Sequence, residues 1–217
     1  MTEEEARAWL ERSFDVSRET WSRLERYVAL LLDEMARQNL IAESTRDHVW
    51  ARHIVDSAQL LPIAPKPTRA RDIWVDLGTG AGLPGMVVAI LSRFRVRLIE
   101  MRRKRVEFLT AVIDDIGLAN ATVIAGKVER ATPADGPAAV ISARAYAPME
   151  RLIPSARHLA DFSTIWLLPR GQNYKNELDI AHTLWHYDVS IEPSLTAPDS
   201  AILKLTHVGG GKGKRSS

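Results

Sequence analysis

The first third of the chain repeats apolar residues at the three- and four-residue spacing of amphipathic helices. A capping box, Thr2 to Glu5, begins the first pattern, and a second covers residues 21–35 with Arg, Glu and Asp between the apolar positions. A third covers about residues 47–61 and ends before the proline-rich stretch PIAPKP. These patterns predict an N-terminal helical extension over residues 1–70.

From Ile73 onward, short apolar runs alternate with helical patterns, and the clearest helix covers residues 102–117. This alternation predicts an α/β fold with a parallel, Rossmann-like sheet that is covered on both faces. Two final runs, 184–192 and 200–208, predict a terminal antiparallel hairpin. We therefore expect a core over residues 71–208 and a basic, flexible tail over 209–217. The strands are expected at residues 73–77, 96–100, 121–125, 138–142 and 164–169.

Composition narrows the class of protein. Hydrophobic residues make up 46% of the 217 residues and charged residues 26%, as in an ordinary folded domain. The chain starts with an acidic stretch, and no apolar run approaches the roughly 20 residues of a membrane span. With no cysteine, disulfides, thiolate metal sites and cysteine nucleophiles are excluded. We expect a cytoplasmic protein that does not bind a membrane or a metal.

Positive charge is concentrated although the net charge is only +2. Such clusters attract polyanions, of which nucleic-acid phosphates are the commonest in a cell. The plainer interpretation is a solvated face. One cluster, over residues 93–105, holds seven basic residues, and Lys212, Lys214 and Arg215 lie in the tail.

The stretch VDLGTGAGLPG, at residues 75–85, predicts a nucleotide-type site, because a glycine-rich turn before a helix brings backbone N–H groups close to a ligand. Two alignments fit it. Gly80, Gly82 and Gly85 match the dinucleotide pattern G-x-G-x-x-G, whereas Asp76, Gly78, Gly80 and Gly82 match D-x-G-x-G-x-G, which is typical of S-adenosylmethionine sites. The first alignment indicates a small NAD(P)-dependent oxidoreductase and the second a methyltransferase.

Three features favour the methyl donor, and a class I S-adenosylmethionine-dependent methyltransferase fold with it. Asp76 has no assigned role in a dinucleotide site, but in the other alignment it orients the loop and meets the cationic end of an amino-acid-like ligand. Pro84 removes a backbone donor that a pyrophosphate would use. The terminal hairpin leaves too little chain for a substrate domain. Glu100, at the end of the second strand, suits a ribose in either alignment.

The sequence also limits the methyl acceptor. Methylation of cytosine carbon 5 requires a cysteine nucleophile, which this chain lacks. Enzymes that methylate exocyclic base amines usually carry a D/N-P-P-Y/F motif after the fourth strand, where this chain has VISARAYAP. A ring nitrogen such as guanine N7 already carries a free lone pair and requires no proton removal. Such an enzyme needs mainly orientation of its reactants. A further alternative is an RNA-binding protein that keeps the fold without catalysis.

Several stretches together resemble one family. NLIAESTRDHVWARHIVDSAQLL and VDLGTGAGLPG, followed by RLIE, RRKRVEFL, AGKVE, SARAYAPMERLI and LLPRG, are similar in order and spacing to the RsmG (GidB) family of bacterial small-subunit ribosomal RNA methyltransferases. The resemblance runs from about Tyr27 to Leu205. It implies methyl transfer from S-adenosylmethionine to N7 of a guanosine in the 530 loop of 16S ribosomal RNA. The substrate is then the small subunit or an assembly intermediate, and we expect a monomer.

The resemblance also implies site residues. Arg144, after the fourth strand, is the candidate nearest the chemistry, because a guanidinium holds a carboxylate or phosphate in a fixed fork. The chain departs from the family's usual residues at two charged positions near the site. Lys127 stands where the family usually has arginine, and Arg170–Gly171 stands where it usually has a Lys-Gly pair. The residues that the likeness places at the cofactor or close to it are Gly78, Leu83, Val128, Glu129 and Arg144.

Three residues of the N-terminal extension, His53, Asp56 and Trp50, are expected to have structural rather than catalytic roles. His53 and Asp56 lie three apart, so they can pair on one helical face. We expect them to tie the N-terminal helices to the core near the cofactor mouth rather than to act in catalysis. Trp50 falls at a helical core position, although it and Tyr146 have rings that can stack on a base.

Overall fold

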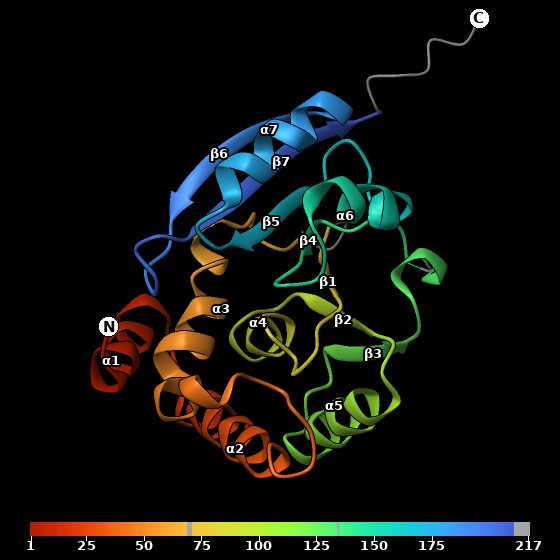
Figure 1. Ribbon diagram of the computed structural model, residues 1–217. Helices are drawn as coiled ribbons and strands as arrows, with labels where there is room; N and C mark the ends of the chain where they lie inside the picture. Colours follow the sequence, from red (N-terminus) through yellow and green to blue (C-terminus); the bar gives the residue numbers. More distant parts are fainter. Residues whose placement is uncertain (69–70, 134, 211–217) are drawn as a thin grey trace, which may run out of the picture.

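The computed structural model describes residues 1–68, 71–133 and 135–210, and a seven-stranded sheet lies at its centre (Figure 1). The strand order is β3-β2-β1-β4-β5-β7-β6, with β1 to β5 parallel and β7 antiparallel to both neighbours. The predicted parallel sheet and terminal hairpin are confirmed. The strands are β1 (Ile73–Leu77), β2 (Arg95–Glu100), β3 (Ala121–Ala125), β4 (Val140–Ser142), β5 (Ile165–Arg170), β6 (His186–Pro193) and β7 (Ala201–Gly209).

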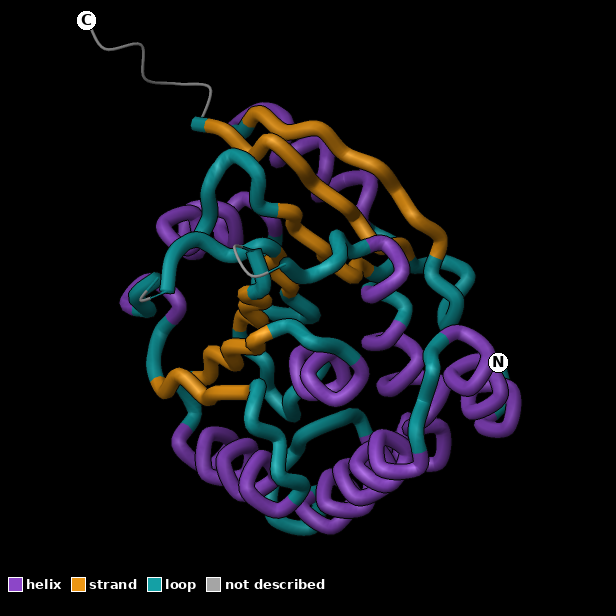
Figure 2. Tube along the Cα trace, turned by 180° about the vertical axis from the view of Figure 1, so that it is seen from behind, coloured by secondary structure: helices purple, strands orange, loops and turns teal. Residues whose placement is uncertain are grey.

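Helices lie on both sides of this sheet (Figure 1, Figure 2). On one side α4 and α5 pack on the sheet, and α2 packs on them; on the other side lie α6 and α7. The helix predicted over 102–117 is α5, and it ends before Gly117, whose φ is +60°. The helices are α1 (Glu3–Ser13), α2 (Arg18–Glu34), α3 (Asp56–Ala58), α4 (Gly85–Leu91), α5 (Arg103–Asp115), α6 (Met149–Ala156) and α7 (Tyr174–Leu184).

The central strands β1 and β4 are buried on both faces, and alternate side chains enter different cores. Trp74 of β1 and Leu98 of β2 join the cluster on the α4 side, whereas Val75 and Ile99 join the cluster beneath α6. The same period places Asp76 on the α4 face, at the carboxyl end of β1. Ligands bind at this end of the strands in open α/β sheets.

The N-terminal segment differs from the prediction in one place. The capping box forms, with Thr2 and Glu5 bonded reciprocally, and α1 and α2 follow as expected. Residues 47–61, however, are not one α-helix: a 3-10 helix (η1, Glu43–His48) leads into a π-helix (η2, Trp50–Val55), then α3 and the 3-10 helix η3 (Leu61–Ile63). The amides of Trp50 and Ala51 donate to the Glu3 carboxylate at 3.0 and 2.9 Å, which anchors η2 to α1.

The N-terminal segment packs into the main core. One apolar cluster joins Leu24 and Tyr27 of α2 and Ile54 of η2 to Met86 of α4, so the boundary near residue 70 stays a prediction. The predicted flexible tail lies outside the described residues from position 211, and Gly209 itself ends β7. No helix among the described residues is long and apolar enough to cross a membrane.

Candidate active site

The glycine-rich loop turns sharply between β1 and α4. Gly78, Gly80 and Gly82 have φ of +59°, +61° and +99°, a region in which L side chains are strained. Gly85 has ordinary backbone angles, but a Cβ there would overlap Leu98 of β2. The loop therefore needs glycine for conformation at three positions and for close packing at the fourth.

The carboxylate of Asp76, in β1, fixes this loop through hydrogen bonds to two of its residues. The side chain is fully buried, and its Oδ2 accepts hydrogen bonds from the Thr79 hydroxyl at 2.5 Å and the Gly85 amide at 3.0 Å. Its Oδ1 accepts a bond from the Ser142 hydroxyl at 2.7 Å. Burial raises the pKa of Asp76 to about 6, against the lowering effect of these three donors. With no exposed surface of its own, Asp76 acts on a ligand through the loop that it positions.

Glu100 lies where β2 ends, beside the loop. Its Oε2 accepts a hydrogen bond from the Gly80 amide at 3.0 Å, and its Oε1 accepts one from the Arg102 amide at 2.8 Å. Arg105 of α5 lies 3.8 Å from the same carboxylate. Each carboxylate oxygen keeps one unused lone pair, so Glu100 can accept two further hydrogen bonds from a ligand.

A cavity of about 410 Å³ opens at the carboxyl ends of β1, β2 and β3. It brings together four of the nine residues that the sequence assigned to the cofactor: Gly78, Glu100, Val128 and Glu129. Arg144 lines a neighbouring cavity instead, and the other four, Asp76, Gly80, Gly82 and Leu83, belong to the glycine-rich turn and its support and do not line this cavity. Its wall also includes Met101, an apolar side chain that is 63% exposed. Such a wall combines carboxylates with an apolar surface on which a flat ring can lie. Its remaining lining residues are Ile99, Arg102, Arg105, Gly126, Lys127, Ala145 and Tyr146.

A second, larger cavity of about 670 Å³ adjoins the first, and Ala145 and Tyr146 line both. The loops after β4 and β5 form its floor, and the N-terminal segment and the β6–β7 loop form its walls. Tyr146 packs against Gly78: a Cβ on that glycine would lie 2.5 Å from the ring. The two cavities thus meet at the tyrosine, beside the glycine loop.

Arg144 lies in the larger cavity and is held by the N-terminal segment. Its Nη1 lies 3.0 Å from Oδ2 of Asp56, and both side chains are mostly buried. The Thr196 hydroxyl of the β6–β7 loop donates to Oδ1 of the same carboxylate at 2.7 Å, and Gln59 donates to it at 3.0 Å. Asp56 therefore joins three parts of the chain that are distant in sequence.

His53 forms another part of this wall. Its Nε2 lies 2.7 Å from the Thr45 hydroxyl, and its Nδ1 is buried without a hydrogen-bond partner among the described residues. Burial, with Arg144 nearby, lowers the pKa of His53 to about 4, so the imidazole is neutral at pH 7. His53 and Asp56, whose spacing allowed a pairing between them, have other partners instead: His53 contacts Thr45, and Asp56 pairs with Arg144.

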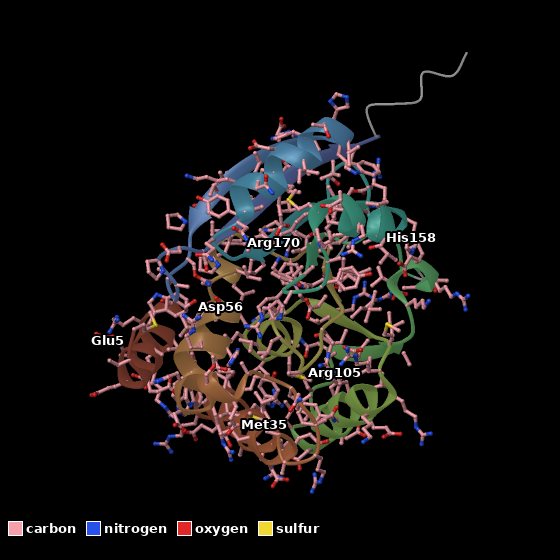
Figure 3. The ribbon with its side chains drawn as sticks, in the orientation of Figure 1. Glu5, Met35, Asp56, Arg105, His158 and Arg170 are labelled. Atoms are coloured by element: carbon pink, nitrogen blue, oxygen red, sulfur yellow. The ribbon has the colours of Figure 1, made fainter. Side chains whose placement is uncertain are left out.

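Arg170 supports the cavity floor from the end of β5. It is only 7% exposed, and its two Nη atoms donate to the carbonyls of Ala143 and Ala147, each at 3.2 Å. Its Nε lies 3.2 Å from Glu177 of α7. Figure 3 labels Asp56 and Arg170, which both line this cavity. The guanidinium braces the loop that carries Arg144.

Comparison with known proteins decides the family. The family model described as GidB, rRNA small subunit methyltransferase G, matches residues 20–201. The chain belongs to this family. It is 47% identical to the ribosomal RNA small subunit methyltransferase G of Rhizorhabdus wittichii, covering 99% of both chains, and 46% identical to that of Zymomonas mobilis, covering 96% of this chain and 95% of the relative. The resemblance stated from the sequence is confirmed.

Solved structures support the fold. A mutant of MtNAS in complex with S-adenosylmethionine aligns with a TM-score of 0.58 at 17% identity, over 94% of this chain and 83% of that one. A SAM-dependent methyltransferase from Aquifex aeolicus aligns at 0.55 with 10% identity, over 74% of this chain and 92% of that one. The predicted class I methyltransferase fold is confirmed.

The basic segment of this family member does not form one surface. Arg95, near the amino end of β2, pairs with Asp72 at 2.8 Å, and Arg97 pairs with Asp135. Arg102 to Arg105 lie instead at the carboxyl end of the same strand, beside the smaller cavity. Only this second group lies at the end of the sheet where the site is.

Sequence reasoning missed several supports of the site. The buried Tyr27 of α2 donates from its hydroxyl to the Ala81 carbonyl at 3.0 Å, and burial raises its pKa. Thr79 and Ser142, which hold Asp76, have no signature of their own. Periodicity marked Tyr27 as an apolar core position, and nothing local indicates that its hydroxyl reaches the glycine loop. Trp50, expected in the core, is buried and stacks on Trp21 with ring centroids 5.3 Å apart.

Proposed function

We propose that this protein transfers a methyl group from S-adenosylmethionine to N7 of a guanosine in the 530 loop of 16S ribosomal RNA. As a member of its family it is an S-adenosylmethionine-dependent methyltransferase of small-subunit ribosomal RNA. The observation that carries the proposal is the pair of adjoining cavities at the carboxyl ends of the strands, which meet at Ala145 and Tyr146. One suits a nucleoside cofactor and the other an acceptor base.

The residues of the smaller cavity fit the cofactor. The two remaining lone pairs on the Glu100 oxygens match the two neighbouring hydroxyls of a ribose. Val128 and the exposed Met101 offer apolar surface to an adenine, and Glu129 lies beside them. When bound, the cofactor supplies a methyl group on a positively charged sulfur.

The glycine loop has a positioning role in this proposal. The backbone turn of Gly78, Gly80 and Gly82, with the adjoining Leu83, borders the amino-acid end of the cofactor. Asp76 fixes the turn through Thr79 and Gly85 without reaching the ligand. In this proposal the loop contacts the cofactor and Asp76 only supports the loop, which explains why a fully buried carboxylate begins the motif.

Arg144 is the proposed residue nearest the reacting groups. Its guanidinium can hold a carboxylate or phosphate, and Asp56 already fixes its orientation at 3.0 Å. The chain's remaining contribution is orientation: guanine N7 attacks without losing a proton, so holding the base against the methyl group and excluding water supply the catalysis. No general base is required.

The finer assignments are part of the same proposal. We infer a cytoplasmic monomer, because the substrate is ribosomal RNA and both cavities are complete within one chain. The RNA is presented either in the small subunit or in an assembly intermediate. Lys127, at the rim of the smaller cavity, supplies a point charge to a phosphate where an arginine would supply a fork.

The test is transfer of labelled methyl from S-adenosylmethionine to small ribosomal subunits from cells lacking this gene, followed by nuclease digestion. We expect label in 7-methylguanosine. Naked 16S RNA and assembly intermediates, offered in parallel, identify the preferred substrate. Label in another nucleoside would overturn the assigned atom.

Arg144→Ala and an exposed control, Arg151→Ala, complete the test. We expect Arg144→Ala to lose about tenfold or more in kcat/KM, since a hydrogen bond to a charged group is removed at the site. Arg151→Ala should retain the activity. Bound S-adenosylhomocysteine without any transfer would instead indicate an RNA-binding protein, and binding of NADH alone would indicate an oxidoreductase.

A further inference from the structure

A residue in the wall of the larger cavity, His53, has a buried side-chain nitrogen without a hydrogen-bond partner among the described residues. This nitrogen is Nδ1. The side chain as a whole is 8% exposed. An unpaired buried polar atom is unfavourable, so a ligand that pairs with it is favoured.

The hydrogen-bond network fixes the tautomer of this imidazole. Thr45 donates its single hydroxyl proton to the Ala42 carbonyl at 2.7 Å. The same hydroxyl oxygen lies 2.7 Å from Nε2 of His53, so it accepts and Nε2–H donates. In the neutral ring, Nδ1 is then a bare acceptor. It requires an N–H or O–H from its partner.

The position of His53 selects which edge of a base it meets. His53 belongs to the N-terminal wall, whereas the residues that line the cofactor cavity all lie between positions 78 and 146. A guanine that directs N7 toward the cofactor directs its opposite edge, with the 2-amino group, away from it. The 2-amino group is a donor that adenine lacks at this position.

We propose that the larger cavity is the binding pocket of the acceptor guanine, and that Nδ1 of His53 accepts a hydrogen bond from the guanine 2-amino group. This assignment rests on the proposed function, because it takes N7 as the atom methylated. Tyr146 and Pro148 provide flat apolar surfaces in the same cavity, and Asp56 keeps the wall in place through Arg144 and Thr196. As the base enters, the ring of His53 or its neighbours must shift to admit the amino group, since Nδ1 is closed to water in the free protein.

Two amide variants separate the nitrogens of His53. Asn places its amide close to the position of Nδ1, so His53→Asn retains an acceptor there and loses the Thr45 contact. Gln reaches further, so His53→Gln retains a group for Thr45 and removes the acceptor at Nδ1. A merely structural role through Thr45 predicts that Gln is the better replacement, and the proposal predicts that Asn is.

The substrate is varied in the same way. Small subunits are reconstituted from 16S RNA that carries either guanosine or inosine at the position where the wild-type enzyme deposits 7-methylguanosine. Inosine lacks only the 2-amino group and keeps N7. Initial rates of labelled methyl transfer give kcat/KM for each enzyme on each substrate, and S-adenosylhomocysteine binding checks that each variant has a folded cofactor site.

We expect the wild-type enzyme to prefer guanosine by about tenfold, the effect of one hydrogen bond to a buried group. His53→Gln should lose about tenfold on guanosine and little on inosine, which brings the ratio near one, whereas His53→Asn should retain most of the preference. Any intrinsic difference in N7 reactivity cancels when the ratios are compared.

Two results would overturn the assignment. One is equal use of guanosine and inosine by the wild-type enzyme, which requires no variant to fold. The other is an unchanged ratio in His53→Gln with both rates reduced. Either leaves the proposed function standing as long as wild-type protein forms 7-methylguanosine; failure to form it on guanosine subunits would instead refute that function.

Discussion

Replacement of Asp76 tests whether its buried carboxylate holds the glycine loop. In Asp76→Ala, three buried donors lose their acceptor: the Gly85 amide and the hydroxyls of Thr79 and Ser142. Each unsatisfied buried donor costs about 1–3 kcal/mol, and the two hydroxyls can rotate to recover part of this. We expect a loss of about 3–6 kcal/mol in the free energy of unfolding, a large share of the roughly 5–15 kcal/mol of a typical domain.

Asp76→Asn should be milder, because one oxygen can still accept from Thr79 and Gly85. Its amide nitrogen then faces Ser142, whose oxygen already accepts from Trp74 Nε1 at 2.8 Å. The Ser142 hydroxyl proton is left without an acceptor, so we expect a loss of about 1–3 kcal/mol. The exposed Asp33→Asn on α2 is the matched control, expected within about 0.5 kcal/mol of wild type.

Urea denaturation followed by tryptophan fluorescence measures these free energies, and titration calorimetry with S-adenosylhomocysteine measures the effect on the loop. The m-value should stay constant, so that midpoint shifts report stability. The explanation is refuted if Asp76→Asn is as mild as Asp33→Asn, or if Asp76→Ala unfolds no more easily than Asp76→Asn.

Three further predictions follow from the site. Gly85→Ala should lower the free energy of unfolding by about 1–3 kcal/mol, since its Cβ would overlap Leu98, whereas Gly171→Ala, with open space around the new methyl, should change it little in the same urea titration. Glu100→Gln should weaken S-adenosylhomocysteine binding by about tenfold in calorimetry, because one charged acceptor is lost, and the exposed Glu107→Gln should not. His53 has a folded-state pKa of about 4, below the unfolded value of 6.5, so the unfolded chain binds the proton first and stability should fall by up to about 3 kcal/mol as the pH drops from 6.5 to 4. Asp76, whose pKa is raised to about 6, works in the opposite direction between about pH 4 and 6, so the His53 contribution is measured as the difference between wild type and His53→Asn, and an equal pH slope in both would contradict it.

Local patterns predicted the fold because each element satisfies its own rule. The central strands β1 and β4 are buried on both faces, as a sheet covered on both sides requires, and α5 ends just before Gly117, which has the positive φ of a helix terminus. The segment after residue 42 did not follow its periodicity. There the amides that begin η2 donate to Glu3 of α1, a contact that spans more than 40 residues and has no local signal.

The site was predictable to the extent that its residues follow consecutive strands. The glycine loop follows β1, Glu100 is the last residue of β2, and Val128 lies three residues beyond the end of β3. Parallel strands bring those ends together. The contacts of the N-terminal wall could not be predicted in this way. The partners of Asp56 depend on how α3 packs beside the loops after β4 and β6, which no local pattern shows. The spacing of His53 and Asp56 allowed a contact between them, whereas in the fold Asp56 pairs with Arg144 and His53 contacts Thr45.

The basic segment shows most clearly why a charge cluster in sequence is not a surface in space. Strand β2 runs from Arg95 to Glu100, so Arg93 and Arg95 lie at its amino end, whereas Arg102 and its neighbours follow its carboxyl end. Each residue of a strand advances the chain by about 3.3 Å. The two groups therefore lie at opposite ends of β2, and Asp72 pairs with Arg95 of the group at its amino end. We therefore expect the group that follows β2, Arg102 to Arg105, to attract RNA toward the site, together with Lys127 and Arg52 in the walls of the two cavities. Because several of these charges line the two cavities, we expect the end of the sheet proposed to hold the cofactor to attract the phosphate backbone as well.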